Sequence, residues 1–359
     1  MIRPYFQPAV IAFTSALLSL SSLSCSKSEK PPIVPIDPPP GENTFTNPLL
    51  NGADPWVAQK DGVYYYLHTT GGNIQIRKTT AISKLSSALS QTIYTPTSGA
   101  ANSRNVWAPE IHFLEGKWYI YYTAGDGNDV NQRTWVLENS NADPTTGTWV
   151  DKGKIFNTNA DFWAIDGSVL QHNNVNYFIW CGRPDRTNIN LTQNIYISRM
   201  TNPWTLEGPV TMLTTPQLGW ERNGFGVNEG PQSLKGPTGK QFLIYSASFC
   251  GTDDYALGML TLKDGGNPMT LADWEKSQQP VFSKNPTGNA FGPGHNGFFK
   301  SSDGTEDWII YHANSSTGQG CGGSRNVRIQ KFTYNSAGVP VFGSPVATGL
   351  KVNVPSGEK

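Results

Sequence analysis

Five polar side chains stand alone in stretches that are otherwise apolar or rich in glycine and proline. They are Asp54, Glu110, Asp166, Glu229 and His295, and each precedes a short aromatic-aliphatic run by 8 to 13 residues. A single acid near the end of a strand usually belongs to a turn or faces solvent. Five such residues at comparable places predict instead that four carboxyl groups and one imidazole meet at a common site.

A cluster of carboxyl groups predicts acid–base chemistry. Like charges in a partly dry pocket cannot all ionise at their usual pKa, so one acid stays protonated while another stays ionised. Cleavage of a glycosidic bond uses this pair, because an acid protonates the leaving oxygen and a base activates water. Metal binding is the second use of clustered acids. These acids come from separate segments, however, and lack the dense oxygen ligands of a calcium loop.

Five aromatic-aliphatic runs must position these residues, and their starts are 54, 59, 65 and 66 residues apart. Each follows a turn-forming segment, as the second strand of a β-hairpin does, and no long amphipathic helix is evident. The runs are residues 64–68, 118–122, 177–180, 242–245 and 308–311. Five similar all-β units predict a five-bladed β-propeller, whose innermost strands line the central channel and carry the polar residues.

The N-terminal segment predicts export. Arg3 precedes an uncharged, mostly apolar stretch at residues 9–23, which is typical of a signal peptide and short for a membrane span. Ser24 and Cys25 predict a lipoprotein-type signal over residues 1–25, with Cys25 lipidated in the cell envelope, in the periplasm or at the outer membrane surface. An ordinary secretory cut is the alternative. Proline dominates residues 26–44, which we expect to form a tether, and residues 45–359 remain for the propeller catalytic domain.

The charge balance bears on the partners. The chain has 27 basic and 27 acidic side chains, so no overall field favours nucleic acid. Its 11 Trp, 14 Tyr and 16 Phe could stack on sugars, although large β cores are also rich in aromatic residues. We expect a neutral oligosaccharide or polysaccharide as partner, no nucleic acid, membrane contact only through the lipid anchor, and a monomer.

Three further cysteines lie beyond Cys25, and an odd number leaves at least one of them unpaired. Cys250 and Cys321 both lie in glycine-rich, loop-like segments, so we expect these two to pair. Cys181 ends an apolar strand, which predicts a buried free thiol.

Several segments together resemble glycoside hydrolase family 43. They are ADPWV (53–57), WAPEIH (107–112), AIDGSV (164–169), NEGPQSL (228–234) and GPGHNGF (292–298). The resemblance spans about residues 46–348, and the order and spacing of the motifs make it specific. It implies a five-bladed β-propeller that hydrolyses glycosidic bonds with inversion.

The resemblance also implies roles for the acids. Asp54 is the general base, Glu229 is the general acid, and Asp166 raises the pKa of Glu229 and orients it. The two carboxyl groups of an inverting pair lie roughly 6.5–9.5 Å apart, which leaves room for water. The chemistry needs no cofactor, but the family resemblance implies a structural Ca²⁺ in the central channel, bound beside His295 largely through water. An isolated histidine is otherwise more often structural.

Residues that flank the acids are candidates for substrate binding. They are Trp56, Trp107, Glu110, Trp163, Phe225 and Arg325. Core packing explains many such aromatic rings, and Glu110 could equally hold the adjacent proline turn. Arg328, close to Arg325, could also reach sugar hydroxyls or lie at the surface.

The resemblance narrows the substrate to α-L-arabinofuranosides or β-D-xylosides. Asp54 argues against galactan-cleaving relatives, which lack this base, and the chain ends soon after the fifth repeat, whereas many family xylosidases carry a C-terminal β-sandwich. Residues 105–124, 246–260 and 321–334 are most similar to exo-acting α-1,5-L-arabinofuranosidases. We therefore predict an inverting hydrolase that releases L-arabinofuranose from arabinan or other arabinose-containing plant polysaccharides. Endo-α-1,5-L-arabinanase and β-xylosidase are the alternatives within the family, and a non-catalytic carbohydrate-binding propeller is the alternative of another class.

Overall fold

The computed structural model describes residues 43–184 and 192–358. The predicted signal peptide, Cys25 and nearly all of the predicted tether lie outside the described residues. Over the two described ranges, no helix has the length and apolar character needed to cross a membrane.

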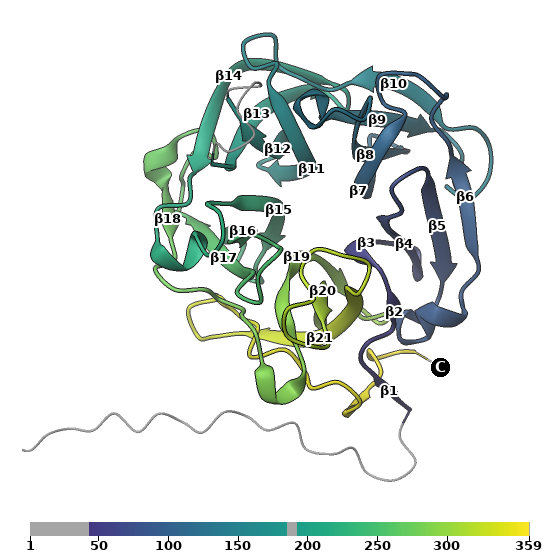
Figure 1. Ribbon diagram of the computed structural model, residues 1–359, viewed down its shortest axis with the longest axis vertical. Helices are drawn as coiled ribbons and strands as arrows, with labels where there is room; N and C mark the ends of the chain where they lie inside the picture. Colours follow the sequence, from purple (N-terminus) through teal and green to yellow (C-terminus); the bar gives the residue numbers. More distant parts are fainter. Residues whose placement is uncertain (1–42, 185–191, 359) are drawn as a thin grey trace, which may run out of the picture. The chain divides into compact units, whose positions relative to one another are not determined.

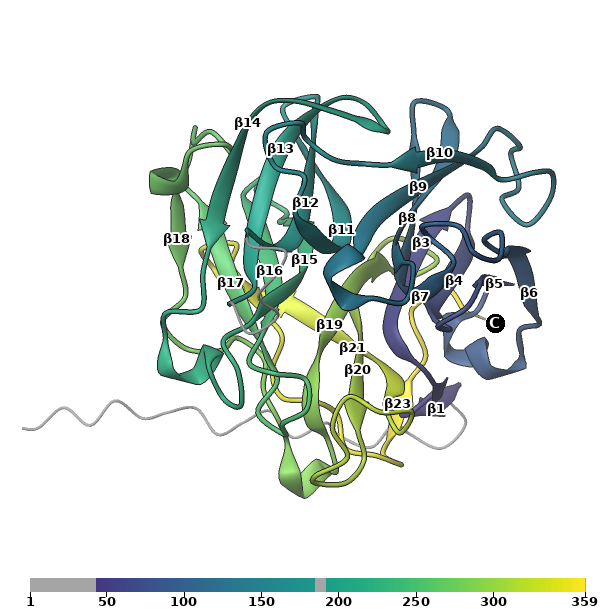
Figure 2. The same cartoon turned by 45° about the horizontal axis from the view of Figure 1, so that its top comes forward.

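Five antiparallel sheets surround a common centre, which confirms the predicted five-bladed β-propeller (Figures 1 and 2). The innermost strands face one another across this centre and are β3 (Ala53–Lys60), β7 (Arg104–Leu114), β11 (Trp163–His172), β15 (Asn228–Lys235) and β19 (Phe291–Lys300). The second strands are β4 (Val63–Thr69), β8 (Lys117–Gly125), β12 (Val175–Arg183), β16 (Gln241–Ala247) and β20 (Asp307–Asn314). These second strands contain the five aromatic-aliphatic runs of the sequence.

The outer strands of the blades vary in length. The third strands are β5 (Ile74–Thr79), β9 (Arg133–Asn139), β13 (Asn194–Asn202), β17 (Ala256–Leu262) and β21 (Asn326–Tyr334). The fourth strands are β6 (Ser90–Tyr94), β10 (Val150–Lys154), β14 (Thr205–Thr214), β18 (Trp274–Lys276) and β2 (Leu50–Asn51). Helical structure among the described residues is limited to the 3₁₀ turns η1 (Ile82–Ser87), η2 (Asp129–Asn131), η3 (Gly219–Glu221), η4 (Leu271–Asp273) and η5 (Pro286–Gly288).

The second strands are almost wholly apolar because both of their faces are buried. The blades are numbered in chain order by their innermost strands, so that β3, β7, β11, β15 and β19 belong to blades one to five. In β4, Tyr64 and Tyr66 pack toward blade five, whereas Tyr65 and Leu67 pack toward blade two. Side chains alternate between the two faces of a strand, so a strand between two blades needs apolar residues at every position. The core is correspondingly divided into five clusters, each between two adjacent blades.

The N-terminal part of the propeller closes the ring. Strand β2 pairs with β21 of blade five, while β3, which follows it, begins blade one. Strand β1 (Thr44–Thr46) pairs with β23 (Lys351–Asn353), and β22 (Pro340–Val341) pairs with β21. The Gly52 N–H also donates to the Arg325 carbonyl at 3.0 Å. Closure therefore fixes the segment that carries Arg325 next to the first innermost strand.

Every innermost strand contains a β-bulge, seen as a break in its pairing with the second strand, and β7 and β19 each contain a second break nearer their start. At the level that all five strands share, the first unpaired residue of the break is here named the bulge residue, and it has a positive φ. The five are Asp54 (56°), Ala108 (42°), Asp166 (54°), Gly230 (54°) and His295 (47°). Left-handed backbone at non-glycine residues and bulges both concentrate at functional sites. The repeated bulges therefore mark one level of the channel as the place to look for chemistry.

Candidate active site

One cavity of about 390 Å³ lies at the level of the bulges. It brings together seven residues that the sequence singled out, namely Asp54, Trp107, Asp166, Trp163, Glu229, His295 and Arg325. Its size suits a small ligand such as one or two sugar rings. A larger hollow of about 560 Å³ lies at hairpin turns and has Asp264 as its one lining carboxylate. The paired acids therefore place acid–base chemistry in the smaller cavity.

Glu110 does not line the cavity. It lies two residues beyond the bulge residue of β7, is 1% exposed, and accepts hydrogen bonds from Gln232 and, at 3.0 Å, His112. The predicted equivalence of five axial residues holds for Asp54, Asp166 and His295, which are all bulge residues. Glu229 comes one residue before the bulge residue of its strand. Glu110 lies on another level of the channel, where its hydrogen bond with Gln232 connects β7 to β15.

Two predicted aromatic positions also lie outside the cavity lining. The Trp56 indole N–H donates to the Ile111 carbonyl at 2.8 Å and its ring lies against His112, so it packs between blades one and two. Phe225 is half-buried and does not contribute to the lining, whereas Phe249, 43% exposed, does. The aromatic residues that line the cavity are therefore Trp107, Trp163 and Phe249. Trp163 is only 3% exposed and has the Arg183 guanidinium over its ring, which leaves Trp107 and Phe249 to contact a sugar.

The two arginines differ in the same way. Arg328 is fully buried and donates to Asn326, Ser315 and the Asn289 carbonyl, so it holds the fold together. Arg325 lines the cavity and donates to Asp54 Oδ1 at 3.0 Å. Its direct partner in the structure is therefore the predicted base.

Two donors and two imidazole rings surround the Asp54 carboxylate. The Thr69 hydroxyl donates to Oδ2 at 2.6 Å and Arg325 donates to Oδ1 at 3.0 Å. His295 Nδ1 and His312 Nδ1 each lie 3.4 Å from Oδ1, and His312 Nδ1 accepts the Asp54 N–H at 3.0 Å. Burial by itself raises the pKa of Asp54, but His295, Arg325 and His312 outweigh burial and hold this pKa well below its usual value. Asp54 is therefore ionised at neutral pH, as a general base must be.

Glu229 has the opposite environment. Burial raises the pKa of Glu229 to about 7, and the charge of Asp54 adds to this rise, while Tyr255 and Arg325 oppose it. Burial and the charges of Glu229 and Asp54 also raise the pKa of Asp166 well above its usual value. The two carboxyl groups thus hold a proton near neutral pH. The Tyr255 hydroxyl donates to Glu229 Oε1 at 2.8 Å, and the Gly230 N–H donates to Asp166 Oδ2 at 3.1 Å.

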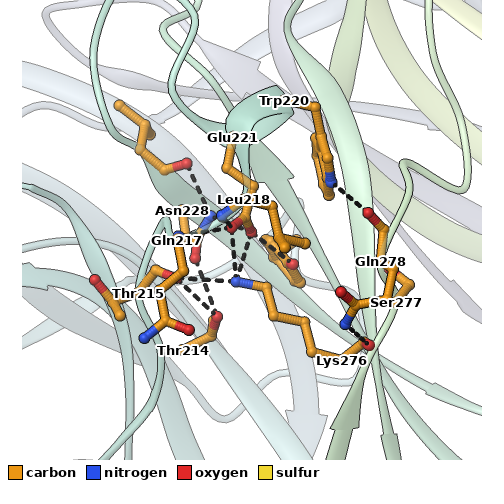
Figure 3. A network of polar contacts seen from close by, with 12 residues as sticks. Thr214, Thr215, Gln217, Leu218, Trp220, Glu221, Asn228, Lys276, Ser277 and Gln278 are labelled. Carbon is orange, nitrogen blue, oxygen red and sulfur yellow. Dashed lines mark hydrogen bonds and ion pairs between the residues drawn. The ribbon is translucent and has the colours of Figure 1, made fainter. Parts of the chain in front are cut away.

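A buried ion pair between Glu221 and Lys276 lies next to the start of β15, the strand that carries Glu229 (Figure 3). Glu221 is fully buried and binds Lys276 at 2.6 Å, the Tyr245 hydroxyl at 2.9 Å and Asn228 Nδ2 at 3.1 Å. Asn228 immediately precedes Glu229, so these contacts fix the start of β15. Glu221 was not predicted from the sequence, because its segment carries no repeated motif that would distinguish it from a surface acid.

A disulfide forms part of the cavity wall. Cys250 and Cys321 are bonded, as the sequence analysis expected, and both line the cavity. The bond joins the loop after β16 to the loop after β20, and the second of these loops leads to Arg325. Cys181 is a buried free thiol, which confirms the second part of that prediction.

The side chains near His295 show whether the channel could bind the implied calcium ion. No group of three or more His, Cys, Asp or Glu among the described residues could hold a metal ion. Asn296, however, is fully buried and neither polar atom of its side chain has a protein partner. Buried polar atoms without a protein partner commonly bind water. This donor set fits a cation bound mainly through water, not one enclosed by protein ligands.

Comparisons with known proteins show the family. Residues 45–340 match the family model described as Glycosyl hydrolases family 43. The chain is 38% identical to an extracellular exo-α-(1→5)-L-arabinofuranosidase of Streptomyces avermitilis, over 94% of this chain and 70% of that protein. It is 40% identical to the enzyme of the same name from Streptomyces chartreusis, over 75% of this chain and 82% of that protein. The crystal structure of an α-L-arabinofuranosidase from Lactobacillus brevis superposes with a TM-score of 0.79 at 35% identity, covering 85% of this chain and 98% of that one.

Proposed function

The chain belongs to glycosyl hydrolases family 43, and from this premise we propose that it is an exported, exo-acting α-L-arabinofuranosidase that inverts the anomeric centre. The observation that carries this proposal is the opposite pKa shift of two carboxyl groups in one cavity, Asp54 downward and Glu229 upward to about 7. The relatives at 38% and 40% identity bear the name of this activity.

The proposed reaction uses these two groups in concert. Asp54 takes a proton from a water molecule, which attacks the anomeric carbon of the terminal arabinofuranose. Glu229 gives its proton to the glycosidic oxygen as the bond to that carbon breaks. Asp166 keeps the proton available at Glu229, because a second ionised carboxylate nearby opposes the loss of that proton. Trp107 and Phe249 offer apolar faces to the sugar rings.

Product analysis on defined substrates tests the proposal. Purified protein from residue 43 onward should release only arabinose from linear α-1,5-arabinan, and the first product seen by proton NMR should have the inverted anomeric configuration. Longer fragments would indicate an endo-arabinanase, and xylose from xylan oligosaccharides would indicate a β-xylosidase. Binding without any product would favour the non-catalytic module.

We keep the structural calcium ion as a proposal for the axial channel. His295 and the unpartnered Asn296 side chain would hold it, the latter through water, and its role would be to fix the positions of the innermost strands around the channel. Elemental analysis of the purified protein should find about one calcium per chain, and His295→Ala should remove it. Calcium bound equally by that variant would contradict the assignment.

Lipidation of Cys25 is likewise a proposal, and it rests on the sequence alone. In cells, the full chain should fractionate with membranes, and Cys25→Ala should release it into the soluble fraction. An unlipidated N-terminus, shown by mass spectrometry of the mature protein, would favour ordinary secretion.

A further inference from the structure

A hydrogen bond between blades repeats at the bulges. In four blades, the N–H of the bulge residue donates to a side chain on the second strand of the preceding blade. The pairs are Asp54 with His312 Nδ1 (3.0 Å), Ala108 with Thr69 Oγ1 (2.7 Å), Asp166 with Thr123 Oγ1 (3.0 Å) and His295 with Ser246 Oγ (2.7 Å). These bonds satisfy a backbone donor that the bulge removes from the sheet.

Blade four departs from this pattern. Its bulge residue, Gly230, donates instead to Asp166 Oδ2 at 3.1 Å. The strand register identifies the residue of blade three that corresponds to the acceptor residues of the other blades. Each of Thr69, Thr123, Ser246 and His312 pairs with the residue just before the bulge residue of its own blade.

Cys181 occupies the same register position in blade three, opposite Ile165. A thiol is a weak hydrogen-bond acceptor, and the Cys181 Sγ donates to Gln193 Oε1 at 3.4 Å instead. Innermost strands β11 and β15 are neighbours, so Asp166 is near enough to accept the Gly230 N–H in place of the side chain at position 181.

We infer that Cys181 is a positioning residue, which leaves the Gly230 N–H free to hold Asp166 beside the general acid. The inference rests on the roles proposed for Asp166 and Glu229. A hydrogen bond from an amide favours the ionised form of Asp166, so the proton that the two carboxyl groups hold stays on Glu229. A better acceptor at position 181 would capture the amide, and the proton would then move toward Asp166.

Other groups act on the two carboxyl groups and stay unchanged in the test. Apart from the substituted Cys181, the charged and titratable side chains around them are Asp54, Glu110, Asp129, Tyr255, His295 and Arg325. Substitutions that differ only in an acceptor at position 181 therefore isolate the effect of the amide.

Two matched pairs of variants provide this test. Cys181→Ser and Cys181→Thr introduce the hydroxyl acceptors that blades one, two and four use, whereas Cys181→Ala and Cys181→Val fill similar space without one. The titration of Glu229 is followed by carbon-13 NMR of glutamate-labelled protein, with its signal assigned by its loss in Glu229→Gln. Thermal unfolding identifies the folded variants, and either matched pair is sufficient.

The Ser and Thr variants should lower the titration midpoint of Glu229 by about one pH unit, which corresponds to a tenfold change in its proton affinity. The Ala and Val variants should titrate as the wild type does. Unchanged titration in the hydroxyl variants, or an equal shift in the Ala and Val variants, would overturn the inference. Because this readout needs no substrate, it stands even where arabinose release fails and the proposed activity is wrong.

Discussion

The Asp54 side of the cavity differs from the side that holds Glu229 and Asp166. Asp54 receives hydrogen bonds from Thr69 and Arg325 and has two imidazoles close by. Glu229 receives one hydrogen bond from a side chain, the Tyr255 hydroxyl, and has a second carboxyl group as its neighbour. Burial raises the pKa on both sides. The partners that blade five supplies to Asp54, namely His295, Arg325 and His312, therefore decide that this carboxyl group is ionised.

This difference teaches how a repeated unit produces two chemical roles. Asp54 and Asp166 are both bulge residues with nearly the same φ, of 56° and 54°. The second strands and loops beside them differ, however, because His312 and Arg325 stand by Asp54, whereas Cys181 and Glu229 stand by Asp166. The opposite directions of the two pKa shifts arise from these neighbours, and four substitutions test this explanation.

Asp54→Asn should have the largest effect. It removes the base but retains the size of the side chain, so turnover of arabino-oligosaccharides should fall about 10⁴-fold. The loss should be similar for an aryl arabinofuranoside with an activated leaving group, because such a group does not help water to attack. Steady-state rates on both substrates check this, and a much smaller loss on the aryl substrate would contradict the role of Asp54.

Glu229→Gln should separate the two substrates. The rate on arabino-oligosaccharides should fall about 10³-fold, because the leaving oxygen then lacks its proton donor. An aryl arabinofuranoside whose leaving group needs no proton should lose about tenfold or less. Equal losses on both substrates, with an unchanged thermal unfolding midpoint, would remove Glu229 from the acid role.

Asp166→Asn should act through Glu229. Removing a neighbouring negative charge makes loss of the Glu229 proton easier and so lowers its pKa. The alkaline limb of the pH profile of kcat/KM should then move down by about one pH unit, and kcat should fall about 10²-fold. A profile that keeps its wild-type limb while kcat falls would give Asp166 a role other than control of the proton.

Phe249→Ala should have the smallest effect. Losing an aromatic face should raise KM for arabino-oligosaccharides about fivefold with little change in kcat. Phe225→Ala is the matched control, since Phe225 does not line the cavity and its removal should leave KM unchanged. If the Phe225 variant raised KM and the Phe249 variant did not, the sequence-based choice would be restored.

The sequence could predict the blades because hairpin turns and buried second strands are local patterns. The run at residues 64–67 is apolar at each position, and only burial on two faces explains this. It could also predict Asp54, Asp166 and Glu229, because a lone acid in a glycine- and proline-rich strand is unusual. Closure of the ring by β2 was not predicted. This strand has two residues and pairs with β21 near the other end of the chain, so it leaves no local sequence pattern.

The contacts around the acids could not be predicted from the sequence for a related reason. Bulges shift which side chains face the cavity, so Glu110 was grouped with residues of a level it does not share. Thr69, Tyr255 and Glu221 bind the acids or their strands from distant loops and second strands. Phe249 was missed in favour of Phe225, since the path of a loop decides which ring reaches the cavity.

The pH dependence of kcat/KM for arabinotriose with the wild-type protein is the first measurement to make, because it reports whether the pKa of Glu229 is raised while that of Asp54 is lowered. The pKa of Glu229 is raised to about 7, so the acid is protonated below that pH and loses its proton as the pH rises through it. We expect kcat/KM to be retained up to about pH 7 and then to fall about tenfold per pH unit. A fall that begins near the ordinary glutamate pKa of about 4.3 would contradict it.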